Sequence, residues 1–94
     1  MRIVYLPSTR QDLLWFRQYY QVVFTAGDKK VKVHFHAMQQ LLLSNPYIGR
    51  QVDGKENVRE LQIARTPFSV IYRVTATQIE ILRVWDNRQG AQGV

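Results

Sequence analysis

Apolar residues in the first half of the chain recur with the period of an α-helix. Between residues 9 and 24, four of them are spaced three or four positions apart: Leu13, Phe16, Tyr20 and Phe24. That spacing places them on one helix face, which is widened by Leu14, Trp15 and Tyr19. A second apolar stripe, with the spacing 4-3-4, consists of Val31, Phe35, Met38 and Leu42. The pattern therefore predicts two amphipathic helices.

Capping and breaking residues mark the limits of these helices. Ser8 followed by Gln11 has the spacing of a capping box, so the first helix is expected to start there. Asp28 follows the break at Gly27 and is a good N-cap for the second helix. The segment Ser44-Asn45-Pro46 ends that helix. Because only a few residues separate the two helices, we expect an antiparallel helical hairpin.

From Val58 onward the apolar period changes to two, the period of a β-strand. Three strands are predicted, over residues 58–64, 68–74 and 78–85, and the short turns between them favour an antiparallel meander. Residues 2–6 are expected to form a further strand that ends at Pro7, because proline cannot donate to a sheet ladder. Residues 47–57 are expected to form a loop.

These elements predict an α+β fold. It consists of an N-terminal strand, an antiparallel helical hairpin and then a three-stranded antiparallel meander, with the helices packed on one face of the sheet. Its 94 residues suffice for one domain, so we expect a single domain over residues 1–94 in which residues 88–94 fray. No apolar run has the length of a membrane span or a secretory leader, which favours a cytoplasmic protein.

Composition limits the chemistry. Cysteine is absent, so neither a disulfide nor a thiolate metal site can form. His34 and His36 lie two residues apart on a predicted helix and cannot share a face. We therefore expect no metal and no other cofactor.

The charge balance points to an anionic partner. Thirteen Lys and Arg against seven Asp and Glu give a net charge of +6, and nine of the cations are Arg. Arg suits bidentate contact with carboxylate or phosphate, which favours nucleic acid or an acidic protein surface as the partner. A solvated basic surface without a specific partner is the alternative.

Alternation along the strands groups Arg with large aliphatic residues. One predicted face of the first strand carries Arg59, Leu61, Ile63 and Arg65. One face of the second carries Ser69, Ile71 and Arg73, and one face of the third carries Ile79, Ile81, Arg83 and Trp85. This pattern predicts a groove with a basic rim, for RNA phosphates or for the apolar face of an acidic segment. Alternatively, each Arg pairs with a nearby carboxylate or is solvated at the sheet edge.

Three segments follow one another in the second half of the chain: Val58-Arg59-Glu60-Leu61, Phe68-Ser69-Val70-Ile71-Tyr72-Arg73-Val74 and Ile79-Glu80-Ile81-Leu82-Arg83-Val84-Trp85. The segment Asn45-Pro46-x-x-Gly49-Arg50 precedes them. In order and spacing, this half resembles the ParE/RelE superfamily of toxins from type II toxin–antitoxin systems. The resemblance is closer to ParE, the plasmid-stabilisation type. The helical hairpin also fits in position and length, so the likeness covers nearly the whole chain.

The resemblance implies a bacterial toxin that a cognate antitoxin neutralises by wrapping around it and covering its helices and sheet edge. The helix residues expected to contact the antitoxin are Trp15, Tyr19, Phe35 and Leu42. RelE-like members of the superfamily cut messenger RNA on the ribosome. ParE-like members poison DNA gyrase and are not nucleases.

Departures from the RelE pattern favour gyrase as the target. RelE-like toxins typically carry a phosphate-stabilising Arg just before the aliphatic–Tyr segment of the middle strand, where this chain has Ser69. No Tyr or His follows Tyr72 in the sequence. We therefore expect a ParE-like gyrase poison that binds its target through Arg59, Arg65, Arg73, Arg83, Trp85 and Arg88.

Two alternatives remain. One is a RelE-like, ribosome-dependent endoribonuclease in which Asp86 or Glu60 acts as a base and four cations bind phosphate: Arg65, Arg73, Arg83 and Arg88. The other is a non-toxic module whose groove holds a partner peptide.

Overall fold

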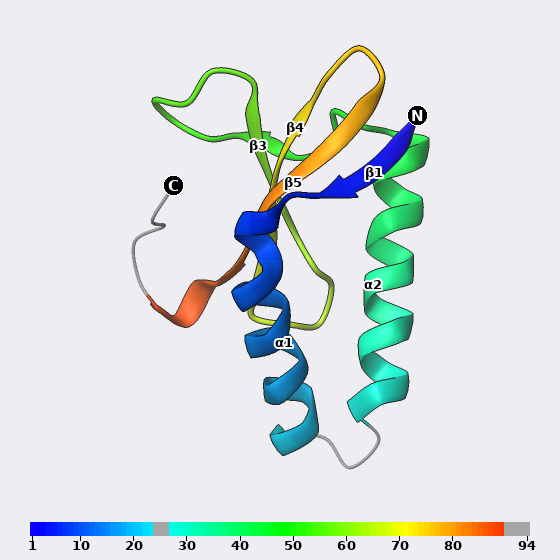
Figure 1. Cartoon of the computed structure of the whole chain (residues 1–94), viewed down its shortest axis with the longest axis vertical. Coiled ribbons are helices and arrows are strands. Elements are labelled where there is room, and N and C mark those ends of the chain that lie inside the picture. Colours follow the sequence, from blue (N-terminus) through cyan, green and yellow to red (C-terminus); the bar gives the residue numbers. More distant parts are fainter. Residues whose placement is uncertain (24–26, 90–94) are drawn as a thin grey trace.

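The computed structural model describes the backbone of residues 1–23 and 27–89 and the side chains of residues 1–19 and 32–88. In chain order the elements, with η for a 3-10 helix, are β1 (Arg2–Tyr5), η1 (Pro7–Thr9), α1 (Arg10–Val23), α2 (Gly27–Ser44), β2 (Arg50–Gln51), β3 (Val58–Gln62), β4 (Phe68–Val74), β5 (Gln78–Asp86) and η2 (Asn87–Gln89). This is the predicted α+β fold (Figure 1). The predicted helix end at Phe24 and the tail 90–94 lie outside the described residues, whereas Arg88 lies within η2.

The sheet has five strands in the order β1-β5-β4-β3-β2. Strands β3, β4 and β5 form the predicted antiparallel meander. Strand β1 pairs with β5 in parallel and forms one edge of the sheet. The opposite edge is β2, a two-residue strand that pairs with β3 inside the stretch expected to be a loop. Two residues are too few for a period-2 pattern, which is why the sequence gives no signal for this strand.

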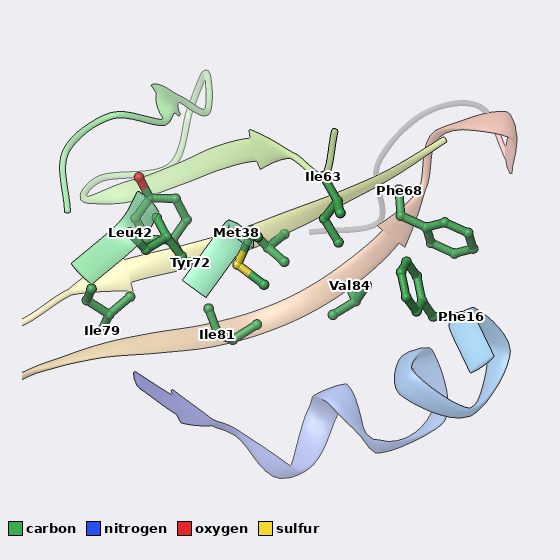
Figure 2. Close-up of a cluster of buried hydrophobic side chains, with 10 residues drawn as sticks. Phe16, Met38, Leu42, Ile63, Phe68, Tyr72, Ile79, Ile81 and Val84 are labelled. Carbon is green, nitrogen blue, oxygen red and sulfur yellow. The ribbon is translucent and has the colours of Figure 1, made fainter. Parts of the chain in front are cut away.

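The two helices lie side by side and cover one face of the sheet (Figure 1). Their core residues Phe16, Met38 and Leu42 pack onto seven sheet-side residues: Ile63, Phe68, Val70, Tyr72, Ile79, Ile81 and Val84. At one end of the core the rings of Phe16 and Phe68 meet edge to face, with their centroids 4.6 Å apart (Figure 2). Full burial of each large apolar side chain contributes roughly 1.5–3 kcal/mol. This cluster is therefore the main source of stability.

The start of the helical hairpin is fixed to the edge of β5 that β1 leaves uncovered. The Leu6 amide donates to the Ile81 carbonyl at 3.1 Å, and the Ser8 hydroxyl donates to the Leu82 carbonyl at 2.7 Å. One turn later, the Asp12 carboxylate accepts a hydrogen bond of 3.0 Å from the Val84 amide. The predicted capping box at Ser8 is therefore wrong, because its hydroxyl bonds to the sheet and α1 begins only after η1.

Strand β5 contains a β-bulge that changes which residues face the helices. Ile71 pairs with Arg83, but the next residue of β4, Tyr72, pairs with Ile81, so Leu82 is an extra residue in β5. An extra residue shifts the alternation by one position. The predicted shared face of Ile79, Ile81, Arg83 and Trp85 is therefore wrong. Ile79 and Ile81 face the helices, and beyond the bulge Val84 takes that side.

The strand pairing also places the two residue sets predicted on β3 and β4 on opposite faces of the sheet. Arg59 lies opposite Tyr72, and Leu61 lies opposite Val70, so both are on the helix side of the sheet. Ser69, Ile71 and Arg73 alternate with those core residues and point to the other side. Arg65 belongs to no strand, because it occupies a turn with a φ of 62°. The single basic-rimmed groove expected from the sequence does not form.

None of the helices in the described ranges has the length and apolar composition needed to cross a membrane.

Candidate partner-binding surfaces

Three of the predicted target-binding arginines form ion pairs at separate places on the sheet. Arg73 pairs with Glu80 on the neighbouring strand at 2.6 Å, Arg83 pairs with Asp12 of α1 at 2.7 Å, and Arg88 pairs with Asp86 at 2.7 Å. The hydrogen bonds from Arg73 and, above all, from Gln78 lower the pKa of Glu80. These pairs spread positive charge over both faces and neutralise much of it. They do not concentrate charge at one phosphate-sized site.

The carboxylate of Asp86 joins the end of β5 to α1. It is 3% exposed and accepts a hydrogen bond of 3.0 Å from the indole Nε1 of Trp15. Arg88 donates to it three times, from its backbone amide at 3.0 Å and its guanidinium at 2.9 and 2.7 Å. The Arg88 guanidinium also lies 4.5 Å from the centre of the Tyr19 ring. We call this group of Trp15, Tyr19, Asp86 and Arg88 the Asp86 latch.

Hydrogen bonding within the Asp86 latch controls the protonation of its carboxylate. Arg88, followed by Trp15, lowers the pKa of Asp86 to about 2, although burial acts in the opposite direction. The carboxylate raises the pKa of Arg88 in return. Asp86 is therefore ionised at neutral pH and poorly suited to accept a proton, which argues against its use as a general base.

A second ion pair joins the first turn of α1 to β5. The Arg83 guanidinium makes a bidentate contact with Asp12, at 2.7 and 2.9 Å, and lies 5.1 Å from the centre of the Trp85 ring. The contact with Asp12 raises the pKa of Arg83. Trp85 faces away from the helices, and its buried Nε1 has no hydrogen-bond partner among the described residues. Arg83 and Trp85 therefore form one feature of the outer face, held by α1.

A partly apolar groove of about 600 Å³ runs along α1 and the end of β1. Its apolar lining includes Tyr5, Pro7 and Leu14, and Arg10 and Arg17 add two cations. Leu14 keeps 50% of its surface exposed, and the neighbouring Trp15 keeps 44%, although the sequence predicted both on the buried helix face. An apolar surface flanked by two guanidinium groups is complementary to an acidic segment with large apolar side chains.

The residues predicted to contact an antitoxin are in different environments. Trp15 is exposed but does not line the groove, and Tyr19 is half-buried within the Asp86 latch. Phe35 packs against Phe16, with 4.5 Å between the ring centroids. Leu42 is fully buried and presents no surface to a partner.

Two side-chain contacts of these surfaces could not be predicted from the sequence. The bonds Trp15–Asp86 and Asp12–Arg83 each join residues 71 positions apart, so no local pattern indicates them. The groove residues, in contrast, have a recognisable spacing in the sequence. Arg10, Leu14 and Arg17 are spaced four and three positions apart, so they lie on one helix face.

Comparison with known proteins gives a consistent answer. The family model described as "ParE toxin of type II toxin-antitoxin system, parDE" matches residues 3–90. A solved structure described as "Chromosomal ParDE TA system from P. aeruginosa" is similar to this fold, with a TM-score of 0.68 and 27% sequence identity. The match covers 89% of this chain and 92% of the solved chain. Among curated proteins, no relative matches.

Proposed function

Because the chain belongs to the ParE toxin family of type II toxin–antitoxin systems, we propose that it arrests bacterial growth by binding and poisoning DNA gyrase. We further propose that a cognate antitoxin neutralises it, and that both events take place in the cytoplasm. The ionisation and hydrogen bonding of the Asp86 carboxylate favour a mechanism by binding over one by RNA cleavage. This carboxylate ends β5, and Arg88 and Trp15 hold it ionised and hydrogen-bonded.

The arrangement of the cations supports binding over cleavage of RNA. An RNA-cleaving site needs a proton acceptor and a cation directed at one scissile phosphate. Arg73, Arg83 and Arg88 are each paired with a carboxylate, at three separate places. Arg65 is exposed, but it lies in the turn before β4. A nuclease mechanism would have to break several ion pairs before these side chains could meet at one phosphate.

The α1 groove supports the proposal of an antitoxin. Arg10 and Arg17 flank the apolar wall that includes Leu14, whose side chain is 50% exposed. An acidic, apolar segment of the antitoxin would bury these side chains and neutralise the two guanidinium charges.

The mechanism is tested by inducing the protein alone in bacteria and by adding the purified protein to gyrase. We expect growth arrest, linear DNA and a DNA-damage response in cells, and inhibited supercoiling with stabilised cleavage complexes in vitro. Unaffected growth at good soluble expression would contradict the toxin assignment for this chain. Codon-specific cuts in messenger RNA with intact DNA, abolished by Arg73→Ala, would replace the gyrase proposal with the nuclease alternative.

A further inference from the structure

The loop before β2 is held by the hydroxyl of a buried tyrosine. Tyr72 in β4 is fully buried (Figure 2), and its hydroxyl donates to the Pro46 carbonyl at 2.8 Å. The same oxygen accepts a hydrogen bond of 2.8 Å from the Gly49 amide. A Cβ atom on Gly49 would lie 2.6 Å from that oxygen and 2.7 Å from the Glu60 carbonyl oxygen. Only glycine allows so close an approach, so residues 46–49 have one defined path.

An arginine of β3 holds the same loop from its other side. The Nη1 atom of Arg59 donates to the Gly49 carbonyl at 2.8 Å and to the Tyr47 carbonyl at 3.2 Å. Its guanidinium lies 5.2 Å from the centre of the Tyr47 ring. Tyr72 and Arg59 are cross-strand partners, so both contacts come from one point of the sheet. We call residues 46–50 the clamped loop.

The clamped loop presents large side chains to solvent. Tyr47 is 62% exposed and Ile48 is 40% exposed, and the Arg50 side chain at the end of the loop is 68% exposed. Single exposed apolar residues are ordinary on protein surfaces. Here two adjacent ones are held out by hydrogen bonds from Tyr72 and Arg59 to the loop backbone, so ordering them on binding would cost little conformational entropy. Tyr, Ile and Arg beside one another supply apolar contact area and hydrogen-bond donors in a fixed arrangement.

A pocket of about 510 Å³ adjoins the clamped loop on the side of the sheet away from the helices. Ile48 and Arg50 form part of its rim, and the buried Ser69 hydroxyl lies on its wall together with Gln62 and Asn87. The Asn87 amide donates to the Ser69 hydroxyl at 2.9 Å. Its lining is therefore a mixture of apolar, amide and hydroxyl groups.

We propose that the clamped loop and this pocket form a docking site for the toxin's protein target, an inference that rests on the proposed action on gyrase. A protein surface fits better than nucleic acid, because Arg50 pairs with Glu60 and Arg59 is directed at backbone carbonyls. Tyr47 and Ile48 would enter an apolar recess of the partner, and the pocket would take a polar side chain from it.

The docking site and the α1 groove lie at opposite edges of the sheet. The groove borders β1, whereas the clamped loop leads into β2, and these are the two edge strands. Antitoxin and target would therefore contact different side chains. This separation makes the inference testable, because a substitution in the loop should affect one partner and not the other.

Two substitutions test the docking site, with binding to purified gyrase and growth arrest as the readouts. Tyr47→Ala should reduce the affinity for gyrase by about tenfold or more, as truncation of an anchoring aromatic does. Ile48→Ser should reduce it in the same direction while leaving the Arg59–Tyr47 contact in place. The matched control is Val33→Ala on α2, because Val33 is 63% exposed, close to the value for Tyr47. Thermal unfolding and retained antitoxin binding show that each variant is folded.

Wild-type affinity for gyrase in both folded loop variants would overturn the docking site. An equal loss in Val33→Ala would also overturn it, because the effect would then not be specific to the loop. If Tyr47→Ala instead abolishes binding to a DNA duplex without gyrase, the site is for nucleic acid and the inference is wrong. If the wild-type protein arrests growth without binding gyrase, the proposed target fails. In that case, loss of growth arrest in both loop variants would still support the docking site.

Discussion

The indole of Trp15 donates a hydrogen bond of 3.0 Å to the carboxylate of Asp86, joining the middle of α1 to the last residue of β5. Trp15 is 44% exposed, but Asp86 is only 3% exposed. A surface residue of the helix thus fixes a buried charge at the point where the chain leaves the sheet. The same carboxylate also binds Arg88 in η2.

Asp86→Asn is expected to destabilise the protein. The amide keeps the size of the carboxylate, but it loses the charge that Arg88 pairs with, and one of its two donor-facing positions becomes an NH₂ group. We expect a loss of about 2–3 kcal/mol in the free energy of unfolding, measured in urea. Trp15→Phe, which removes only the indole donor, should lose about 1 kcal/mol. Equal stability of Asp86→Asn and the wild type would show that the latch contributes nothing.

Stability should fall at acid pH through Asp86. Its pKa is lowered from 3.8 to about 2 in the folded state, so the unfolded chain takes up the proton first as the pH falls. The stabilising contribution is therefore complete above pH 4 and is lost as the pH falls to 2; it amounts to about 2 kcal/mol. The difference in unfolding free energy between the wild type and Asp86→Asn should shrink over this range. Carboxylates that both proteins share, Glu80 among them, cancel in that difference.

Tyr72→Phe should release the clamped loop. The substitution removes both hydrogen bonds of the hydroxyl and leaves the Pro46 carbonyl and the Gly49 amide without their partner. We expect a loss of about 1–3 kcal/mol in unfolding free energy and faster hydrogen exchange at the Gly49 amide. Tyr5→Phe is the matched control, because the Tyr5 hydroxyl accepts a bond from the Gln39 side chain and holds no backbone group. An unchanged exchange rate at Gly49 in Tyr72→Phe would contradict the clamp.

Leu14→Glu should weaken neutralisation without weakening the toxin. A carboxylate at this position places negative charge in the groove between Arg10 and Arg17 and removes apolar contact area. We expect at least about tenfold weaker binding of the antitoxin, and growth arrest that co-expressed antitoxin no longer relieves. Gln40→Glu on α2 adds the same charge at an exposed position outside both the groove and the docking site, and serves as the control. Full rescue of Leu14→Glu by the antitoxin would place the antitoxin site elsewhere.

Much of the fold could be predicted because its signals are local and periodic. The 3.6-residue stripe through Phe16 and the period-2 runs from Val58 identify the helices and the meander. The faces of the strands could not be predicted beyond Leu82, because a bulge is defined by the pairing of two strands and not by either sequence alone. The short strand β2 could not be predicted for a related reason. Its two residues pair with β3, and the loop that leads into it is held by Tyr72.

The candidate surfaces were harder to predict than the fold. Target binding by the arginines stays a prediction, and their partners within the molecule could not be predicted because they lie on other elements. Arg83 forms its ion pair with Asp12 of α1, and Arg73 forms its ion pair with Glu80 on the neighbouring strand. The period-2 pattern of a strand predicts which face a side chain occupies, but it does not predict which carboxylate pairs with an arginine there. Leu42 shows the converse error, because amphipathic spacing alone cannot tell a core position from a partner-facing one.

The extra residue at Leu82 has an evolutionary consequence. Because it sets the alternation of everything after it in β5, Val84 faces the core, Asp86 reaches Trp15 and Arg83 reaches Asp12. Deleting Leu82 would leave a regular ladder with the same faces, whereas deleting a residue between Arg83 and Asp86 would reverse the orientations beyond that point and turn an aromatic or a cation toward Phe16. Substitutions can accumulate along this strand one at a time, whereas a change in its length would have to be compensated in the same step. A chimera that exchanges C-terminal segments with a relative should therefore retain activity only where both parents keep the same number of residues from Arg83 to Asp86.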